Sequence, residues 1–224
     1  MRTTWRNHTD RIVGLLLLVQ LTGLIVPFIM MGAVATPGYL GLAAGKAPQI
    51  RWALLLLLTN GVLTTIIAIA LYPRFRTASP ILAVWLVVLG AGMVALQAVD
   101  NVQVMGMLAL SQAYVADTLS GPLLEVLGAW AAATRRTSHY LLLLTVGAWM
   151  LLFYAACWRT RVVPRLLSGF GMAAAVLHLT GVSLPVLLGF GSIPPMAMAL
   201  ALSHPALAGR LLAHGFDERR GGHL

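Results

Sequence analysis

Residues 52–72 have the sequence WALLLLLTNGVLTTIIAIALY, an unbroken run without a charged side chain. A helix needs about 20 apolar residues to cross the ~30 Å hydrocarbon core of a membrane, and this run is long enough. Five further stretches of similar character lie at about 12–34, 81–99, 140–158, 166–190 and 193–214. We therefore predict an all-α protein, a polytopic membrane bundle of six transmembrane helices.

The composition excludes a water-soluble globular domain. Of the 224 residues, 59% are hydrophobic and 9% are charged, and the mean hydropathy is +0.88. A soluble domain usually carries about 25% charged residues, so most of this surface cannot face water. We predict one transmembrane domain over residues 12–214, with a cytoplasmic N-terminus at 1–11 and a cytoplasmic tail at 215–224.

The residue inventory excludes several kinds of chemistry. Cys157 is the only cysteine, which rules out an intramolecular disulfide and a cysteine-based zinc site. Lys46 is the only lysine and lies in a predicted loop, so a Schiff base buried among the helices is excluded. No phosphate loop, zincin helix or nucleophile elbow is present. We predict no cofactor and no metal.

The basic residues predict the orientation in the membrane. They alternate between the two sides of the predicted spans, and cytoplasmic connections carry the excess of Lys and Arg. One side has eleven and the other four. The first set is Arg2, Arg6, Arg11, Arg74, Arg76, Arg159, Arg161, Arg165, Arg210, Arg219 and Arg220; the second is Lys46, Arg51, Arg135 and Arg136. Both termini are therefore expected in the cytoplasm, with a plasma-membrane location.

The same charges bear on the partners of the chain. The formal net charge is +9, but no run of five basic residues exists, so the partner is expected to be the lipid bilayer and not nucleic acid. A hydrophobic small molecule is a further candidate partner. The sequence does not predict an oligomeric state.

The connection from about residue 100 to residue 139 is long. Residues 102–114 remain helical in character, so the third span is expected to continue beyond the membrane. Residues 123–130 place apolar side chains at helical spacing and predict an extra amphipathic helix on the outer interface. A seventh span within 102–134 is the alternative.

A polar group marks the outer end of the third span. Gln97, Asp100 and Asn101 stand at i, i+3 and i+4 and share one helix face. Such a carboxylate with two amides is suited to bind a cation, donate a proton or orient a lipid headgroup. The alternative is that these three side chains cap the end of the helix and form hydrogen bonds with the outer loop. Glu125 is a second candidate acid.

Two histidines form another candidate site. His178 and His204 lie on predicted antiparallel spans at similar depth, each on a stripe of small residues, so both are expected to face into the bundle. They could bond to neighbouring groups, hold a haem or metal between them, or relay protons. Two further polar stripes predict either interhelical hydrogen bonds or ligand binding: Gln20 with Gly23 and Pro27, and Asn60 with Thr64.

Two short motifs resemble a bacterial membrane family known as domain of unknown function 4386. The run Arg11-Ile12-Val13-Gly14-Leu15-Leu16-Leu17-Leu18 with Thr22-Gly23 is similar to the family's opening, and Val163-Pro164-Arg165-Leu166-Leu167-Ser168-Gly169 to its later Leu-Pro-Arg segment. Ser168 and His178 depart from the pattern. The resemblance implies an uncharacterised inner-membrane protein and supplies no catalytic residue.

Three hypotheses for function follow. The first is a non-enzymatic binding, transport-accessory or envelope-stress component. The second is a membrane-embedded enzyme that acts on a lipid or terpenoid by acid catalysis through Asp100 or Glu125. The third is a haem-binding electron carrier that uses His178 and His204.

Overall fold

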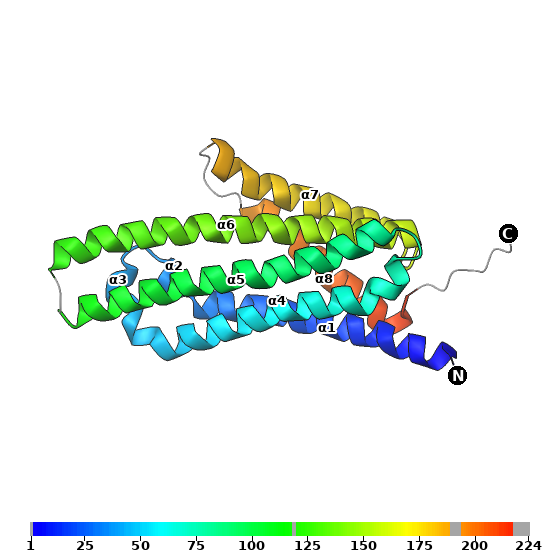
Figure 1. Cartoon of the computed structure of the whole chain (residues 1–224), viewed down its shortest axis with the longest axis horizontal. Coiled ribbons are helices and arrows are strands. Elements are labelled where there is room, and N and C mark those ends of the chain that lie inside the picture. The colour runs from blue at the N-terminus through cyan, green and yellow to red at the C-terminus, as the bar shows by residue number, and fades with distance from the viewer. Residues whose placement is uncertain (1, 118–119, 189–193, 217–224) are drawn as a thin grey trace. The chain divides into compact units, whose positions relative to one another are not determined.

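The computed structural model describes residues 2–117, 120–188 and 194–216, and every regular element within them is helical (Figure 1). Four helices are long, namely α1 (Arg2–Met30), α4 (Ala47–Phe75), α5 (Pro80–Val115) and α6 (Gly121–Thr160). Two more, α7 (Arg165–Leu188) and α8 (Pro194–His214), complete the bundle. Between α1 and α4 lie three short elements, α2 (Gly32–Ala35), α3 (Tyr39–Leu42) and the 3₁₀ turn η1 (Ala44–Lys46).

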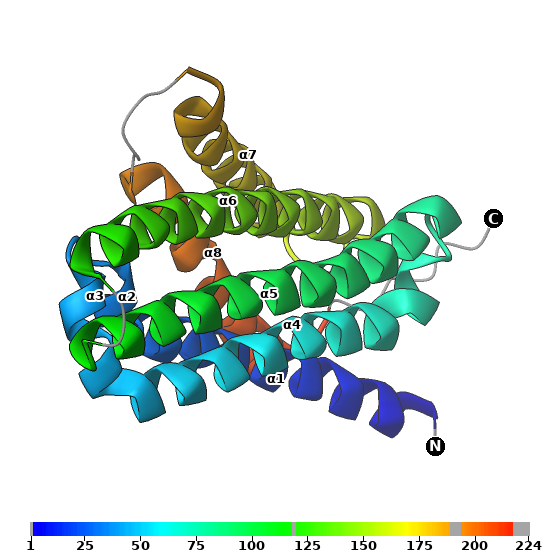
Figure 2. The same ribbon diagram turned by 60° about the vertical axis from the view of Figure 1, so that its left-hand side comes forward.

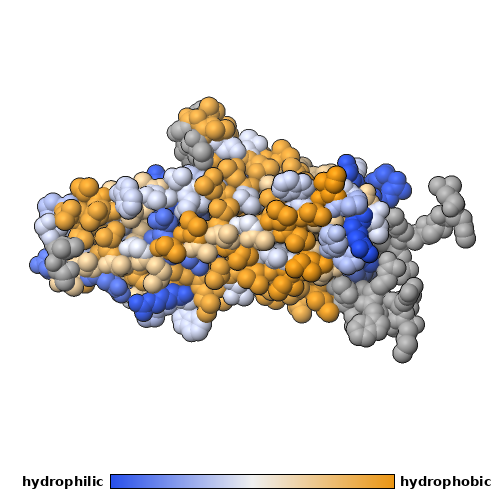
Figure 3. Space-filling model, in the orientation of Figure 1, coloured by the Kyte–Doolittle hydropathy of each residue, from blue (hydrophilic) through white to orange (hydrophobic). Residues whose placement is uncertain are grey.

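The long apolar helices confirm the predicted polytopic membrane bundle. Five helices of the described chain are long and apolar enough to cross a membrane: they cover Asp10–Met30, Ala44–Phe75, Pro80–Val115, Gly121–Thr160 and Arg165–Leu184. The sixth predicted span corresponds to α8, which is not among them. Large apolar side chains are exposed along these helices, as a lipid-facing surface requires, and hydrophobic residues make up most of the face seen in Figure 3.

The long outer connection differs from its prediction. The extra amphipathic helix and the alternative seventh span within 102–134 are both wrong, because residues 121–160 form the single helix α6 of 40 residues. No proline lies between Pro122 and Pro164, so nothing in this stretch breaks a helix. At ~1.5 Å per residue α6 is about 60 Å long, twice the hydrocarbon thickness, and part of it must lie beyond the membrane core.

Proline, a capping side chain and glycine explain where two of the helices begin and end. α5 begins at Pro80, where the missing N–H of proline removes no helical hydrogen bond, and the Ser79 hydroxyl accepts a hydrogen bond from the Leu82 N–H at 3.4 Å. α8 ends at His214, and the φ of +67° at the following Gly215 is the left-handed conformation that glycine adopts readily after a helix C-terminus.

The chain divides into two compact units, and α1, α4, α5 and α6 contribute residues to both. Unit 1 contains Met1–Leu21, Val62–Gly92 and Leu143–Leu224. Its core holds an aromatic group in which Phe153 stacks on Trp149 at 5.1 Å and meets Phe75 edge-on at 6.1 Å. The Trp149 indole donates a hydrogen bond to the Leu86 carbonyl at 2.9 Å, which satisfies its polar edge.

Unit 2 contains Thr22–Gly61 and Met93–Leu142. Its α5 and α6 segments run side by side, with α2 and α3 against them (Figure 2). Ser111 of α5 is fully buried; its hydroxyl donates to the Leu40 carbonyl at 2.7 Å and accepts from the Ala44 N–H at 2.8 Å. The Tyr39 hydroxyl donates to the Gly128 carbonyl of α6 at 3.2 Å. Burial raises the pKa of this phenol, which keeps it protonated as a donor.

Candidate functional site

Asp100 lies inside unit 2 and is the centre of a buried charged cluster. Its side chain is 1% exposed. The Arg135 Nε atom lies 3.5 Å from Oδ1, and the His139 Nδ1 atom lies 3.6 Å from Oδ2. Arg135 and His139 stand four residues apart on α6, so both side chains reach the same point of α5. The positive guanidinium supplies the compensation that a buried carboxylate needs.

This environment differs from the predicted helix cap. α5 continues to Val115, so Asp100 does not lie at a helix end, and its partners come from α6 instead of the outer loop. The sequence placed the amides correctly as neighbours: the Gln97 Nε2 donates to the Asn101 Oδ1 at 2.9 Å. Asn101 in turn donates to the Leu54 carbonyl of α4 at 3.0 Å. Glu125 is exposed, and no described interaction joins it to Asp100.

A groove lies beside Asn101 on the surface of unit 2. It has a volume of about 360 Å³ and runs between α4 and α5. Its lining is apolar except for one cation and one amide: Arg51, Leu54, Leu55, Leu58, Asn101, Val102 and Met105. Arg51 is exposed, and no described acidic side chain lies within ion-pair distance of it. The groove is therefore amphipathic, with its positive charge supplied by Arg51 near the start of α4.

Unit 1 holds a second buried carboxylate that the sequence did not single out. Asp10 is 3% exposed; its Oδ1 accepts a hydrogen bond from Arg74 at 2.7 Å, and its Oδ2 accepts one from the Phe216 N–H at 3.0 Å. The Arg74 guanidinium also lies over the Phe216 ring at 4.5 Å. We call Asp10, Arg74 and Phe216 the clamp. These residues join the N-terminal part of α1, the end of α4 and the residues after α8.

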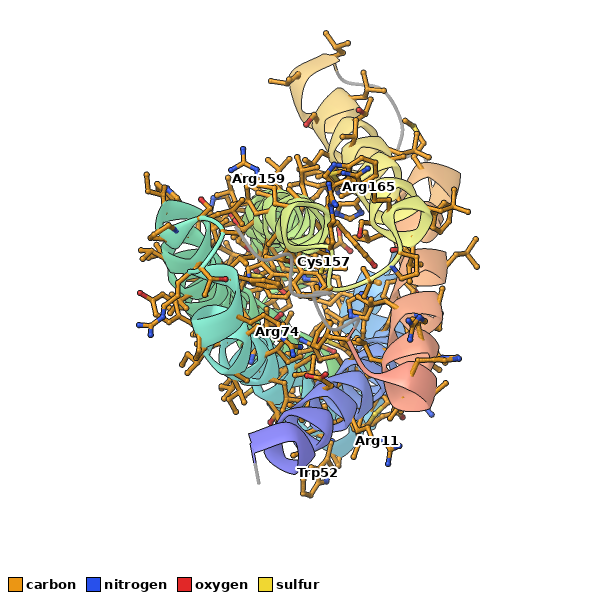
Figure 4. All side chains as sticks on the ribbon, turned by 90° about the vertical axis from the view of Figure 1, so that its right-hand side faces the viewer. Arg11, Trp52, Arg74, Cys157, Arg159 and Arg165 are labelled. Atoms are coloured by element: carbon orange, nitrogen blue, oxygen red, sulfur yellow. The ribbon has the colours of Figure 1, made fainter. Side chains whose placement is uncertain are left out.

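Figure 4 shows the clamp end of unit 1. Arg74 lies among the helix ends near the buried Cys157, whereas Arg11 and Arg159 extend outward. Arg165 lies over the Trp158 ring at 5.6 Å. Arg74 therefore has a structural role besides its contribution to the charge asymmetry. The only sequence signal for the clamp was an aspartate two residues before the first apolar run.

His178 is buried, as predicted, but its partner is a backbone carbonyl. Its Nε2 atom lies 3.1 Å from the Leu143 carbonyl oxygen. The approach is close because α6 carries Gly147 here: a Cβ on Gly147 would lie 2.6 Å from Leu179 and 2.9 Å from the His178 ring. His204 is half-buried, and among the described residues no hydrogen bond joins it to His178.

The two polar stripes contact neighbouring helices as predicted. In unit 1 the Gln20 Nε2 donates to the Thr64 hydroxyl at 2.6 Å, joining α1 to α4. In unit 2 Gly23 faces Asn60, since a Cβ on this glycine would lie 3.3 Å from the Asn60 Oδ1. Such contacts hold helices together where lipid provides no hydrophobic drive for association.

The described residues contain no group of three or more His, Cys, Asp or Glu side chains that could hold a metal ion. The polar features described above are a buried charged cluster at Asp100, a second buried carboxylate at Asp10 and an amphipathic groove at Arg51.

Comparison with family models gives a match over residues 12–215, to a family described as a domain of unknown function, DUF4386. The chain belongs to this family. The DUF4386 match confirms the resemblance seen in the two short motifs, and the two departures from them, Ser168 and His178, are both buried. Neither the curated proteins nor the solved structures compared with the chain give a match. DUF4386 membership thus supports a membrane protein and assigns no activity.

Proposed function

We propose that this chain is a non-enzymatic membrane protein that binds an anionic amphiphile, a phospholipid with a negatively charged headgroup. The headgroup would lie at Arg51 and an acyl chain would follow the groove between α4 and α5. The observation that carries this proposal is the groove lining, in which the Arg51 guanidinium, without an acidic partner among the described residues, stands at the edge of an apolar wall.

The charge and position of Arg51 favour an anion. A guanidinium presents planar donors that match a phosphate or carboxylate. Arg51 directly precedes Trp52, which is 62% exposed and has the character of an aromatic residue at a membrane interface. The apolar run of α4 starts at this point, so the guanidinium would stand at headgroup level while Leu55 and Leu58 contact hydrocarbon.

The environment of the other candidates supports the non-enzymatic hypothesis. Acid catalysis by Asp100 requires a substrate to reach its carboxyl group, but that side chain is 1% exposed and faces Arg135. A haem held between His178 and His204 would need a nitrogen of each ring to face the iron; the His178 Nε2 already faces the Leu143 carbonyl, and its Nδ1, which has no hydrogen-bond partner among the described residues, is buried. A transport-accessory or envelope-stress role has no specific observation in its favour.

Arg51→Gln should lower the retention of anionic lipid about fivefold, because one basic residue near an anionic headgroup contributes about 1 kcal/mol. The measurement is native mass spectrometry of protein released from vesicles of phosphatidylglycerol and phosphatidylcholine. Arg136→Gln is the matched control, since Arg136 is also exposed but lies outside the groove. Equal retention in the wild type and both variants would refute the proposal.

We also propose that the protein lies in the inner membrane with both termini in the cytoplasm, on the strength of the eleven-to-four distribution of basic residues. Reporter fusions after Arg76, Arg161 and Arg220 should then be active in the cytoplasm, and a fusion at Asp117 should be active outside. A reporter after Arg220 that is active outside would contradict the orientation.

A further inference from the structure

The two buried carboxylates of the chain are satisfied in different ways. Each oxygen of Asp10 accepts a short hydrogen bond from the protein, at 2.7 and 3.0 Å. Neither oxygen of Asp100 has a hydrogen-bond partner among the described residues, although the Arg135 and His139 nitrogens face them at 3.5 and 3.6 Å. Asp10 is thus bonded directly by protein groups, and Asp100 is separated from its partners by more than hydrogen-bond length.

Four buried polar atoms without hydrogen bonds meet at this point: both carboxylate oxygens of Asp100, the Arg135 Nε and the His139 Nδ1. Leaving such atoms unsatisfied costs several kcal/mol, and almost all buried polar groups have a partner. The carboxylate offers acceptors, the guanidinium offers a donor, and the imidazole nitrogen can be either. A water molecule needs two to four polar partners of this kind.

We propose that Asp100, Arg135 and His139 form a binding site for water, in which a bound water molecule bridges the carboxylate to the two nitrogen atoms. The charges of the carboxylate and the guanidinium oppose each other, so the site favours a small neutral hydrogen-bonding ligand over an ion. The other charged groups of unit 2, Lys46, Arg51, Asp117, Glu125 and Arg136, are all exposed and do not alter this balance.

The site also has a route for exchange. The exposed fraction of the side chains rises from 1% at Asp100 through 14% at Arg135 to 35% at His139, so the imidazole separates the buried carboxylate from the surroundings. Residue 100 lies about 30 Å along α5 from its start at Pro80, close to the full thickness of the hydrocarbon core. The cluster therefore lies near the membrane boundary, where water is available.

Water-edited solid-state NMR on protein labelled with ¹³C-aspartate, reconstituted in phosphatidylglycerol–phosphatidylcholine bilayers, tests this site. Magnetisation transferred from water should reach the Asp100 carboxyl carbon at least twice as fast as the Asp10 carboxyl carbon. The exposed Asp117 is the reference for a fully hydrated carboxyl group. Asp10 is the matched control because it is equally a buried, charge-paired aspartate whose oxygens are taken by protein donors.

Single substitutions to Asn assign the signals. If Asp100→Asn fails to fold, Asp10→Asn, Asp117→Asn and Asp217→Asn still identify the signal of Asp100, the fourth aspartate of the chain, by elimination. His139→Leu should slow the transfer to Asp100 and leave that to Asp10 unchanged, since it removes one water ligand. An Asp100 signal that builds up as slowly as that of Asp10 would show a dry ion pair and overturn the proposal.

Discussion

Replacing Asp10 by Ala should lower the free energy of unfolding by about 3 kcal/mol, because removal of one partner leaves a buried charge uncompensated. Asp10 is 3% exposed, and the Arg74 side chain that it pairs with is 20% exposed. The substitution also leaves the Phe216 N–H without its acceptor. Reversible unfolding of the protein in mixed detergent micelles measures the effect, with Asp117→Ala as an exposed control that should change little.

The double variant Asp10→Leu/Arg74→Met distinguishes the loss of a contact from the burial of a charge that has lost its partner. Removing both charges leaves the Phe216 N–H without its acceptor but leaves no buried charge uncompensated, so the double variant should be more stable than Asp10→Ala. A double variant that is as unstable as the sum of its two single substitutions would contradict the clamp, since independent sites are additive.

Gly171→Ala should destabilise the protein by about 1–3 kcal/mol through overpacking. A Cβ at this position would overlap the ring of Tyr154, which is fully buried and has no free space to enter. The absence of a side chain on Gly171 is therefore what lets α7 pack against α6 in unit 1. The thermal unfolding midpoint in detergent measures the loss.

Gly209→Ala is the matched control for this prediction. Gly209 lies in α8, and a Cβ there would meet nothing within 4 Å. Alanine at that position should be neutral or slightly stabilising, because a helical glycine gives up more chain entropy on folding. Equal changes in stability in the two variants would mean that contact with Tyr154 does not govern the effect at Gly171.

The features predicted well from sequence are those with a local cause. Apolar runs are long enough to define helices without tertiary information, so the membrane bundle and five of its spans follow from hydropathy. Gln20 was predicted to face a neighbouring helix because a polar amide in hydrocarbon needs a partner, and it bonds to Thr64. The sequence could not identify that partner from periodicity alone.

The features that sequence missed depend on which helices become neighbours. The apolar spacing of residues 123–130 suggested a separate amphipathic helix on the outer interface, but the charges of Arg135 and Arg136 do not end a helix, and α6 runs through this segment. Asp100 was recognised as a candidate, whereas its partners Arg135 and His139 lie 35 and 39 positions further along and only the pairing of α5 with α6 brings them together. Asp10 and Arg74 are paired over a similarly long separation, for the same reason.

The binding of an anionic lipid between α4 and α5 is tested most directly by photo-crosslinking with a phosphatidylglycerol that carries a diazirine on its acyl chain. After irradiation of the reconstituted protein, we predict labelling concentrated at residues 54–58 and 102–105 and reduced in Arg51→Gln. Phe28 and Ile29, which are 75% and 69% exposed in the same unit, are the reference for unspecific lipid contact. Labelling of Phe28 and Ile29 equal to that of the groove, and unchanged by Arg51→Gln, would contradict the proposed function.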